Sequence, residues 1–142
     1  MVNGSSASAY RLIDANANRA LEGLRVCEDI ARFHLVSPAA FRRLRGLRHA
    51  VARSIRMLPV EPAMLIRSRE SHRDIGRRAP TSRVASLEQL LLINFQRAKE
   101  ALRALEESAR LIAPRHAAAF QQLRFRTYEA ERDLLLATLR HH

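Results

Sequence analysis

Cysteine, lysine, aromatic residues and turn-forming residues are all scarce in this chain of 142 residues. A single cysteine, Cys27, excludes an internal disulfide. Four glycines and five prolines are too few for a turn-rich β fold. No apolar run reaches the roughly 20 residues that a membrane-spanning helix needs, and the first eight residues lack the pattern of a secretory signal. We therefore expect a cytoplasmic protein without a membrane partner.

The residues that dominate the chain are Ala, Leu, Arg and Glu, all good helix formers. Hydrophobic residues make up 47% of a chain long enough to bury a core without disulfides or metals. Composition therefore predicts an all-α fold, with residues 1–142 forming a single helical domain.

The charge is strongly one-sided, with 25 basic and 14 acidic residues and a formal net charge of +11. Every basic residue except Lys99 is an arginine. Such a surface is typical of a nucleic-acid or partner-binding helical module, which is one reading of the function. The arginines are spread along the chain and interleaved with Glu, so we do not expect a nucleic-acid partner.

Four helices are predicted, over about residues 9–34, 38–58, 87–112 and 115–139. Ser37 followed by Pro38 is a typical helix start, and Ser86 with Gln89 forms a capping box. The long connection over 59–85 contains a short helical turn near 63–69. A connection of this length inside a compact bundle is usually functional or disordered.

An internal repeat relates the first and third helices. Residues 16–32 align with residues 94–110 at an offset of 78, and nine of the seventeen positions are identical. The identical pairs are Asn16/Asn94, Arg19/Arg97, Ala20/Ala98, Glu22/Glu100, Leu24/Leu102, Arg25/Arg103, Glu28/Glu106, Ala31/Ala109 and Arg32/Arg110. Leu47-Arg48-His49 aligns more weakly with Leu123-Arg124-Phe125. We predict a four-helix bundle from a duplicated αα-hairpin, with repeats at about 10–58 and 86–140.

The repeated polar residues lie at informative positions on the helices. At 100° per residue, Asn16 falls inside the apolar stripe, with Arg19 and Glu22 at its margin. Their mates Arg97 and Glu100 occupy the same register in the second copy. Two arginines from pseudo-symmetric helices in one cleft would grip a phosphate or carboxylate, and the glutamates would orient them or bind a metal.

Other charges suggest ordinary helix-surface pairing. Glu28, Asp29 and Arg32 are expected to form i,i+3 and i,i+4 ladders on a solvated face, each pair contributing roughly 0.2–0.5 kcal/mol. In the connection, Asp74 precedes Gly76 in a basic loop. This loop is either a metal or anion site or an ordinary polar turn. Six scattered histidines lack the spacing of metal ligands.

The first helix resembles a known family. Residues 14–33 contain every fixed position of D-A-N-x-N-R-A-x-E-G-L-R-V-x-E-D-x-A-R-F. This run resembles the opening of a bacterial thiamine-biosynthesis domain, described as a monofunctional hydroxymethylpyrimidine-phosphate kinase and often fused ahead of thiamine-phosphate synthase. The resemblance covers about Tyr10 to Leu136, with Leu21 and Ser71 as small departures. The chain looks like a stand-alone version of this domain.

The resemblance implies ATP- and Mg²⁺-dependent phosphorylation of hydroxymethylpyrimidine monophosphate to the diphosphate. On this basis we predict Arg19, Arg97 and Asp74 as catalytic. Substrate-binding residues are predicted to be Asn16, Arg25, Asn94, Arg103 and Arg69. Asp74, Glu22 and Glu100 are predicted ligands of Mg²⁺. A different small all-α enzyme, a chorismate-mutase-like bundle that binds an anionic metabolite, is the remaining alternative, and a homodimer stays open.

Overall fold

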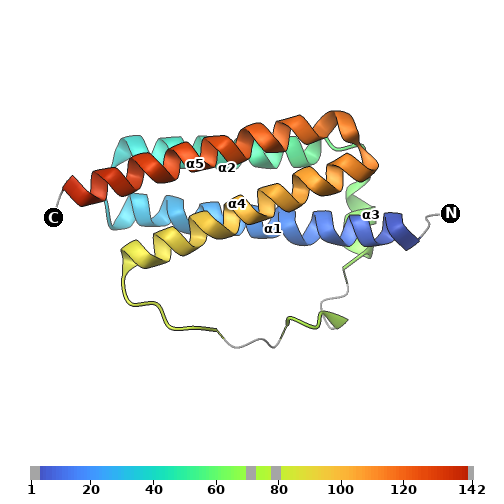
Figure 1. Cartoon of the computed structure of the whole chain (residues 1–142), viewed down its shortest axis with the longest axis horizontal. Helices are drawn as coiled ribbons and strands as arrows, with labels where there is room; N and C mark the ends of the chain where they lie inside the picture. The colour runs from blue at the N-terminus through green and yellow to red at the C-terminus, as the bar shows by residue number, and fades with distance from the viewer. Residues whose placement is uncertain (1–3, 70–72, 78–80, 141–142) are drawn as a thin grey trace.

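A computed structural model of the chain describes residues 4–69, 73–77 and 81–140. The described residues form helices and contain no strand, which confirms the predicted all-α fold (Figure 1). The elements are α1 (Gly4–Phe33), α2 (Pro38–Arg56), α3 (Pro62–Arg67), α4 (Leu87–Ile112), the 3₁₀ turn η2 (Pro114–His116) and α5 (Ala117–Arg140). Among the described residues, no helix combines the length and the apolar character needed to cross a membrane.

The four long helices pack as a bundle of two hairpins. α1 packs against α2 and α4, and α5 packs against α4 and α2, so the helices follow one another around the core in the order α1, α2, α5, α4. Figure 1 shows α1 and α4 crossing with opposite chain directions, while residues 73–77 and 81–86 of the connection lie along one side of the bundle. The two hairpins are therefore related by an approximate twofold axis, as the repeat predicts.

The helix ends follow the local signals closely. The Ser37 hydroxyl accepts a hydrogen bond from the Ala40 N–H at 3.2 Å, and the Ser86 hydroxyl accepts one from the Gln89 N–H at 3.0 Å. α1 begins at Gly4, earlier than predicted, because Ala9 is buried and this end of the helix packs on α3. α5 begins at Ala117, after the single 3₁₀ turn η2.

The crossing of α1 and α4 depends on small side chains. Ala20 and Ala98 are fully buried there, and Gly23 and Ala101 are also buried. A Cβ atom on Gly23 would lie 2.9 Å from the carbonyl oxygen of Asn94. Glycine at this position therefore allows the two backbones to approach closely, which places the polar side chains beside the crossing near one another.

Glu28 does not lie on a solvated face, and that prediction is wrong. Its side chain is 3% exposed and accepts two hydrogen bonds from Arg48 of α2, at 2.6 and 3.2 Å. The second copy repeats this pair, because Arg124 of α5 donates to Glu106 of α4 at 3.1 Å. The weak repeat around Arg48 and Arg124 thus preserves one interhelical ion pair in each hairpin.

The other two residues of the expected ladder differ from Glu28. Asp29 is half exposed and lies 3.8 Å from Arg25, as a surface i,i+4 pair. Arg32 is exposed, and its guanidinium carbon lies 4.8 and 5.6 Å from the ring centroids of Phe33 and Phe41. The ladder prediction therefore holds for Asp29, while Arg32 stacks on aromatic rings.

Lys99 forms an interior ion pair between α4 and α5. Its ammonium group donates to Glu131 at 2.8 Å and lies 4.5 Å from the centroid of the Tyr128 ring. Both charged side chains are nearly buried, at 9% and 12% exposure. The repeat places Leu21 at the position equivalent to Lys99, so this charge belongs to one hairpin alone.

Candidate functional site

A cleft of about 510 Å³ lies between α1 and α4, and we call it the central cleft. Its lining residues are Asn16, Arg19, Glu22, Gly23, Val26, Asn94, Arg97, Glu100 and Ala101. Four residues from α1 match four from α4 at the repeat offset of 78: Asn16/Asn94, Arg19/Arg97, Glu22/Glu100 and Gly23/Ala101. The approximate twofold axis therefore passes through this cleft.

Asn16 and Asn94 are buried where α1 packs against α4, with 6% and 4% exposure. Each side-chain N–H₂ group donates to the carbonyl oxygen four residues earlier, of Leu12 and Leu90, at 2.8 Å. These bonds fix which way each amide is turned. Neither side-chain oxygen accepts a hydrogen bond from a described residue, so both oxygens remain available to a ligand.

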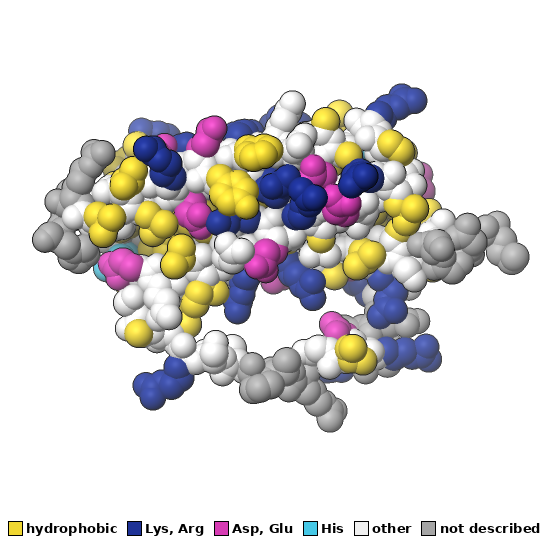
Figure 2. All heavy atoms as spheres, in the orientation of Figure 1, with side chains coloured by type: hydrophobic (Ala, Val, Ile, Leu, Met, Phe, Trp, Pro, Cys, Tyr) yellow, Lys and Arg dark blue, Asp and Glu magenta, His cyan; other side chains and the backbone are white. Residues whose placement is uncertain are grey.

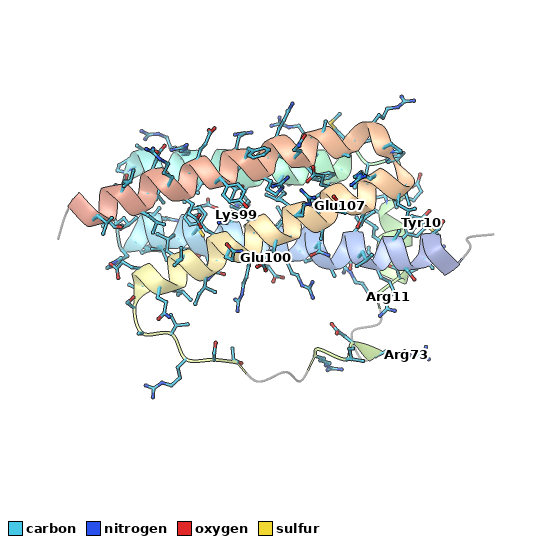
Figure 3. The ribbon with its side chains drawn as sticks, in the orientation of Figure 1. Tyr10, Arg11, Arg73, Lys99, Glu100 and Glu107 are labelled. Carbon is cyan, nitrogen blue, oxygen red and sulfur yellow. The ribbon has the colours of Figure 1, made fainter. Side chains whose placement is uncertain are left out.

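Arg19 and Arg97 bring two exposed positive charges to the central cleft. The i,i+3 spacing places Glu22 and Glu100 beside them, yet neither arginine has a carboxylate oxygen of a described residue within 4.0 Å. Glu100 instead accepts a hydrogen bond from Gln96 at 3.0 Å. In Figure 3, Glu100 lies on the side of α4 away from α5, opposite Lys99. The cleft thus contains two arginines that form no ion pair with a described residue, so both guanidinium groups can bind an anion.

A second cleft of about 660 Å³ adjoins the first, and we call it the side cleft. Its lining residues are Ser8, Arg11, Leu12, Asp14, Ala15, Asn16, Asn18, Arg19, Ser68, Arg69 and Asp74. Asn16 and Arg19 line both clefts, so the two are continuous along α1. Figure 2 shows a gap between the helical body and residues 73–77 and 81–86, with basic side chains projecting from the body beside it.

An ion pair attaches the wall of the side cleft to α1. The Arg69 guanidinium donates two hydrogen bonds to the Asp14 carboxylate, at 2.7 and 2.9 Å. This interaction raises the pKa of Arg69 above its ordinary value. Asp14 was absent from the predicted site, although it opens the D-A-N motif. Arg69 thus meets a carboxylate here, and its predicted substrate contact stays a prediction.

Asp74 lies in the side cleft, apart from the glutamates with which it was expected to share a metal. It is exposed, and its Oδ1 accepts a hydrogen bond from the Gly76 N–H at 2.8 Å. Glu22 and Glu100 line the central cleft instead. Within the described ranges, no three His, Cys, Asp or Glu side chains gather as a metal site. The three-carboxylate set is therefore not assembled, and residues 70–72 of this loop, including Ser71, lie outside the described residues.

Arg25 and Arg103 are not part of either cleft. Arg25 lies 3.8 Å from Asp29, and Arg103 lies 3.7 and 3.3 Å from Glu106 and Glu107 on its own helix. Six residues from Arg19 to Arg25 correspond to about 600° of rotation, which moves the side chain well away from the cleft. Their predicted role as substrate ligands within one chain is not supported by this placement.

A family model and several curated proteins match this chain. The model of the ThiD2 family matches residues 11–133, which include all the cleft-lining residues except Ser8. The chain belongs to the ThiD2 family. It is also 35% identical over 139 residues to the thiamine-phosphate synthase of Rhodopirellula baltica, covering 96% of this chain and 36% of that protein.

Other relatives of this ThiD2 chain show the same partial coverage. The thiamine-phosphate synthase of Synechocystis is 36% identical over 138 residues, covering 95% of this chain and 38% of that protein. That of Synechococcus is 38% identical over 130 residues, covering 91% and 36%. The chain therefore spans a little over a third of the length of these relatives. No solved structure matches it.

Proposed function

We propose that this ThiD2 chain is an enzyme of thiamine biosynthesis that transfers a phosphoryl group from ATP to hydroxymethylpyrimidine monophosphate. The resemblance of residues 14–33 and the names of the relatives support this pathway. The observation that carries the proposal is the central cleft, where neither Arg19 nor Arg97 is ion-paired with a described residue. A monophosphate ester is the kind of anion that such a pair binds.

The reaction requires little covalent chemistry from the protein. An oxygen of the acceptor phosphate attacks the γ-phosphorus of ATP, one P–O bond forms, and the bond from the γ-phosphorus to the β–γ bridging oxygen breaks to release ADP. The acceptor phosphate has a second pKa of about 6, so at neutral pH it attacks without losing a proton to a base. Catalysis of this kind depends mainly on positioning and on neutralising charge.

The described residues supply these two functions. Arg19 and Arg97 hold the acceptor phosphate from both sides, and the fixed amides of Asn16 and Asn94 orient the pyrimidine. Asp74 would hold Mg²⁺, since this ion usually binds one or two carboxylates together with substrate phosphates. When bound, Mg²⁺ neutralises charge on the triphosphate. This arrangement replaces the predicted trio of Asp74, Glu22 and Glu100, whose members lie in different clefts.

The proposal is tested by assaying ADP release with Arg19→Ala, Arg97→Ala and the double variant. Loss of a charged donor at a transferring phosphate is expected to lower kcat/KM by roughly 10²–10³-fold. The double variant is expected to lose less than the product of the two effects, because both arginines contact one phosphate. Arg126→Ala, an exposed change on α5 outside both clefts, is the matched control.

Two outcomes contradict the proposal in different ways. If the wild-type chain forms no diphosphate, the assigned reaction is wrong. If both single variants fold and keep the wild-type rate, the reaction stands but the central cleft is not its site. Thermal-shift measurements with the pyrimidine phosphate, ATP–Mg²⁺ and chorismate separate this reading from the chorismate-mutase-like alternative, because a ligand stabilises the state it binds.

Nucleic-acid binding is a second candidate, favoured by one helix. α2 contains no acidic residue, and its exposed side chains include Arg42, Arg45, Arg53 and Arg56. These positions are spaced three, eight and three apart, which places them on one face. Binding to random duplex DNA that weakens steeply with salt would support this role, whereas an absence of binding at low salt would exclude it.

A further inference from the structure

The approximate twofold symmetry of the site ends at the side cleft. The α1 residues Arg11, Asp14 and Asn18 line this cleft. The equivalent positions on α4 carry Gln89, Leu92 and Gln96. α4 therefore has neither a cation nor an anchoring carboxylate at these positions. On α1, Asp14 accepts two hydrogen bonds from Arg69, whereas Leu92 at the equivalent position of α4 has no acceptor group in its side chain.

We propose that the side cleft is the nucleotide site and that the central cleft holds the pyrimidine phosphate, with Arg19 at their junction. This inference rests on the proposed phosphoryl transfer. Transfer between two unlike substrates needs an asymmetric site. Here the central cleft is approximately symmetric, and the side cleft extends it along α1 but not along α4. The side cleft is also the larger of the two.

The charges of the two clefts fit this division. A triphosphate carries more negative charge than a monophosphate ester, so its site needs more cations. Of the described residues, three arginines line the side cleft, Arg11, Arg19 and Arg69, whereas two line the central cleft. Neither Arg11 nor Arg19 pairs with an acidic group of the described residues, and both line the side cleft with Asp74, the residue able to hold Mg²⁺. Figure 3 shows Arg11 on the side of α1 that faces the segment carrying Arg73.

The lining of the central cleft suits the smaller substrate. Gly23, Val26 and Ala101 contribute apolar lining to this cleft. A flat pyrimidine ring fits against such a surface, with its polar edge toward the amides of Asn16 and Asn94. Because Asn16 and Arg19 line both clefts, the γ-phosphate and the acceptor oxygen meet at these residues. The Asp14–Arg69 pair acts as a positioning pair, since it attaches the wall of the side cleft to α1.

The test compares Arg11→Gln with Arg97→Gln. Glutamine is the residue that the second copy carries at the position of Arg11, so the change suits the helix. Arg11→Gln is expected to raise the KM for ATP roughly tenfold or more and to leave the KM for the pyrimidine phosphate within about twofold. Arg97→Gln is expected to show the reverse pattern, and Arg126→Gln, at an exposed position on α5 outside both clefts, to change neither constant.

Equilibrium binding provides a readout independent of turnover. Isothermal titration of the whole chain with a non-hydrolysable ATP analogue and Mg²⁺ is expected to show weaker binding for Arg11→Gln and unchanged binding for Arg97→Gln. If the wild type transfers no phosphate but shows this binding pattern, the proposed function fails and the nucleotide site stands. If the enzyme is active and Arg11→Gln leaves the KM for ATP unchanged, the cleft assignment is overturned while the function stands. A wild-type chain that binds no nucleotide overturns both.

Discussion

Replacing Glu28 by glutamine is expected to destabilise the bundle strongly, although the residue lies in neither cleft. The Glu28 side chain is 3% exposed and accepts hydrogen bonds at 2.6 and 3.2 Å from Arg48, whose side chain is 19% exposed. Glutamine has nearly the same shape but no charge. The change therefore leaves the Arg48 guanidinium largely buried beside a neutral partner.

The magnitude follows from the exposure of the two partners. Removing one member of a fully buried ion pair costs about 3–5 kcal/mol. Arg48 keeps some access to water, and glutamine still offers one acceptor, so we expect a loss of about 2–3 kcal/mol in the free energy of unfolding. For a chain of this size, that loss lowers the Tm by roughly 6–10 °C.

Urea unfolding followed by circular dichroism measures this change. Asp29→Asn, which breaks the exposed pair with Arg25, is the matched control and is expected to cost less than about 0.5 kcal/mol. The double variant Glu28→Leu/Arg48→Met replaces both charges with apolar groups and is expected to recover most of the lost stability. The reasoning is refuted if Glu28→Gln is as mild as Asp29→Asn, or if the double variant is no more stable than the single one.

Gly23→Ala is expected to lower the free energy of unfolding by about 1–3 kcal/mol, because its Cβ would approach the Asn94 carbonyl oxygen to 2.9 Å. Gly46→Ala, on the exposed face of α2 with nothing within 4 Å, is expected to raise it by about 0.5–1 kcal/mol, and urea unfolding that ranks the two alike would contradict this contrast. Burial, with a smaller contribution from Glu131, raises the pKa of the Cys27 thiol, so a thiol reagent should modify the native chain at least roughly 100-fold more slowly than the urea-unfolded chain. Because the unfolded thiol loses its proton above about pH 8.5 while the folded thiol retains it, stability should fall as pH rises beyond that point, and Cys27→Ala should flatten this slope.

Much of the fold was predictable because its signals are local. The apolar stripe of the first helix is buried as expected, with 0% exposure at Ile13, Ala20, Leu24, Cys27 and Ala31. The Ser37 and Ser86 caps begin their helices, since an N-cap depends on residues only three positions away. The repeat also predicted that Arg19 and Arg97 would share a cleft, because duplicated hairpins pack with matching faces.

The remaining features were set by contacts between residues far apart in the chain. The environment of Glu28 depends on Arg48, twenty residues later on another helix, so its own helix periodicity could not reveal its burial. The side cleft depends on the pairing of Asp14 with Arg69, which are 55 residues apart. The separation of Asp74 from Glu22 and Glu100 likewise follows from where the connection lies along α1.

The sequence alone determined the helices, their caps, the repeat and the central pair of arginines, because each depends on spacing along one helix or on its copy at a constant offset. Only the tertiary structure decided which of the repeated charges reach a cleft. Arg25 and Arg103 repeat as faithfully as Arg19 and Arg97, yet they pair on their own helices outside both clefts. Because α1 and α4 cross at small residues, one face of each helix lines the central cleft. The connection then contacts α1 through Arg69 and Asp14, so the side cleft forms beside α1.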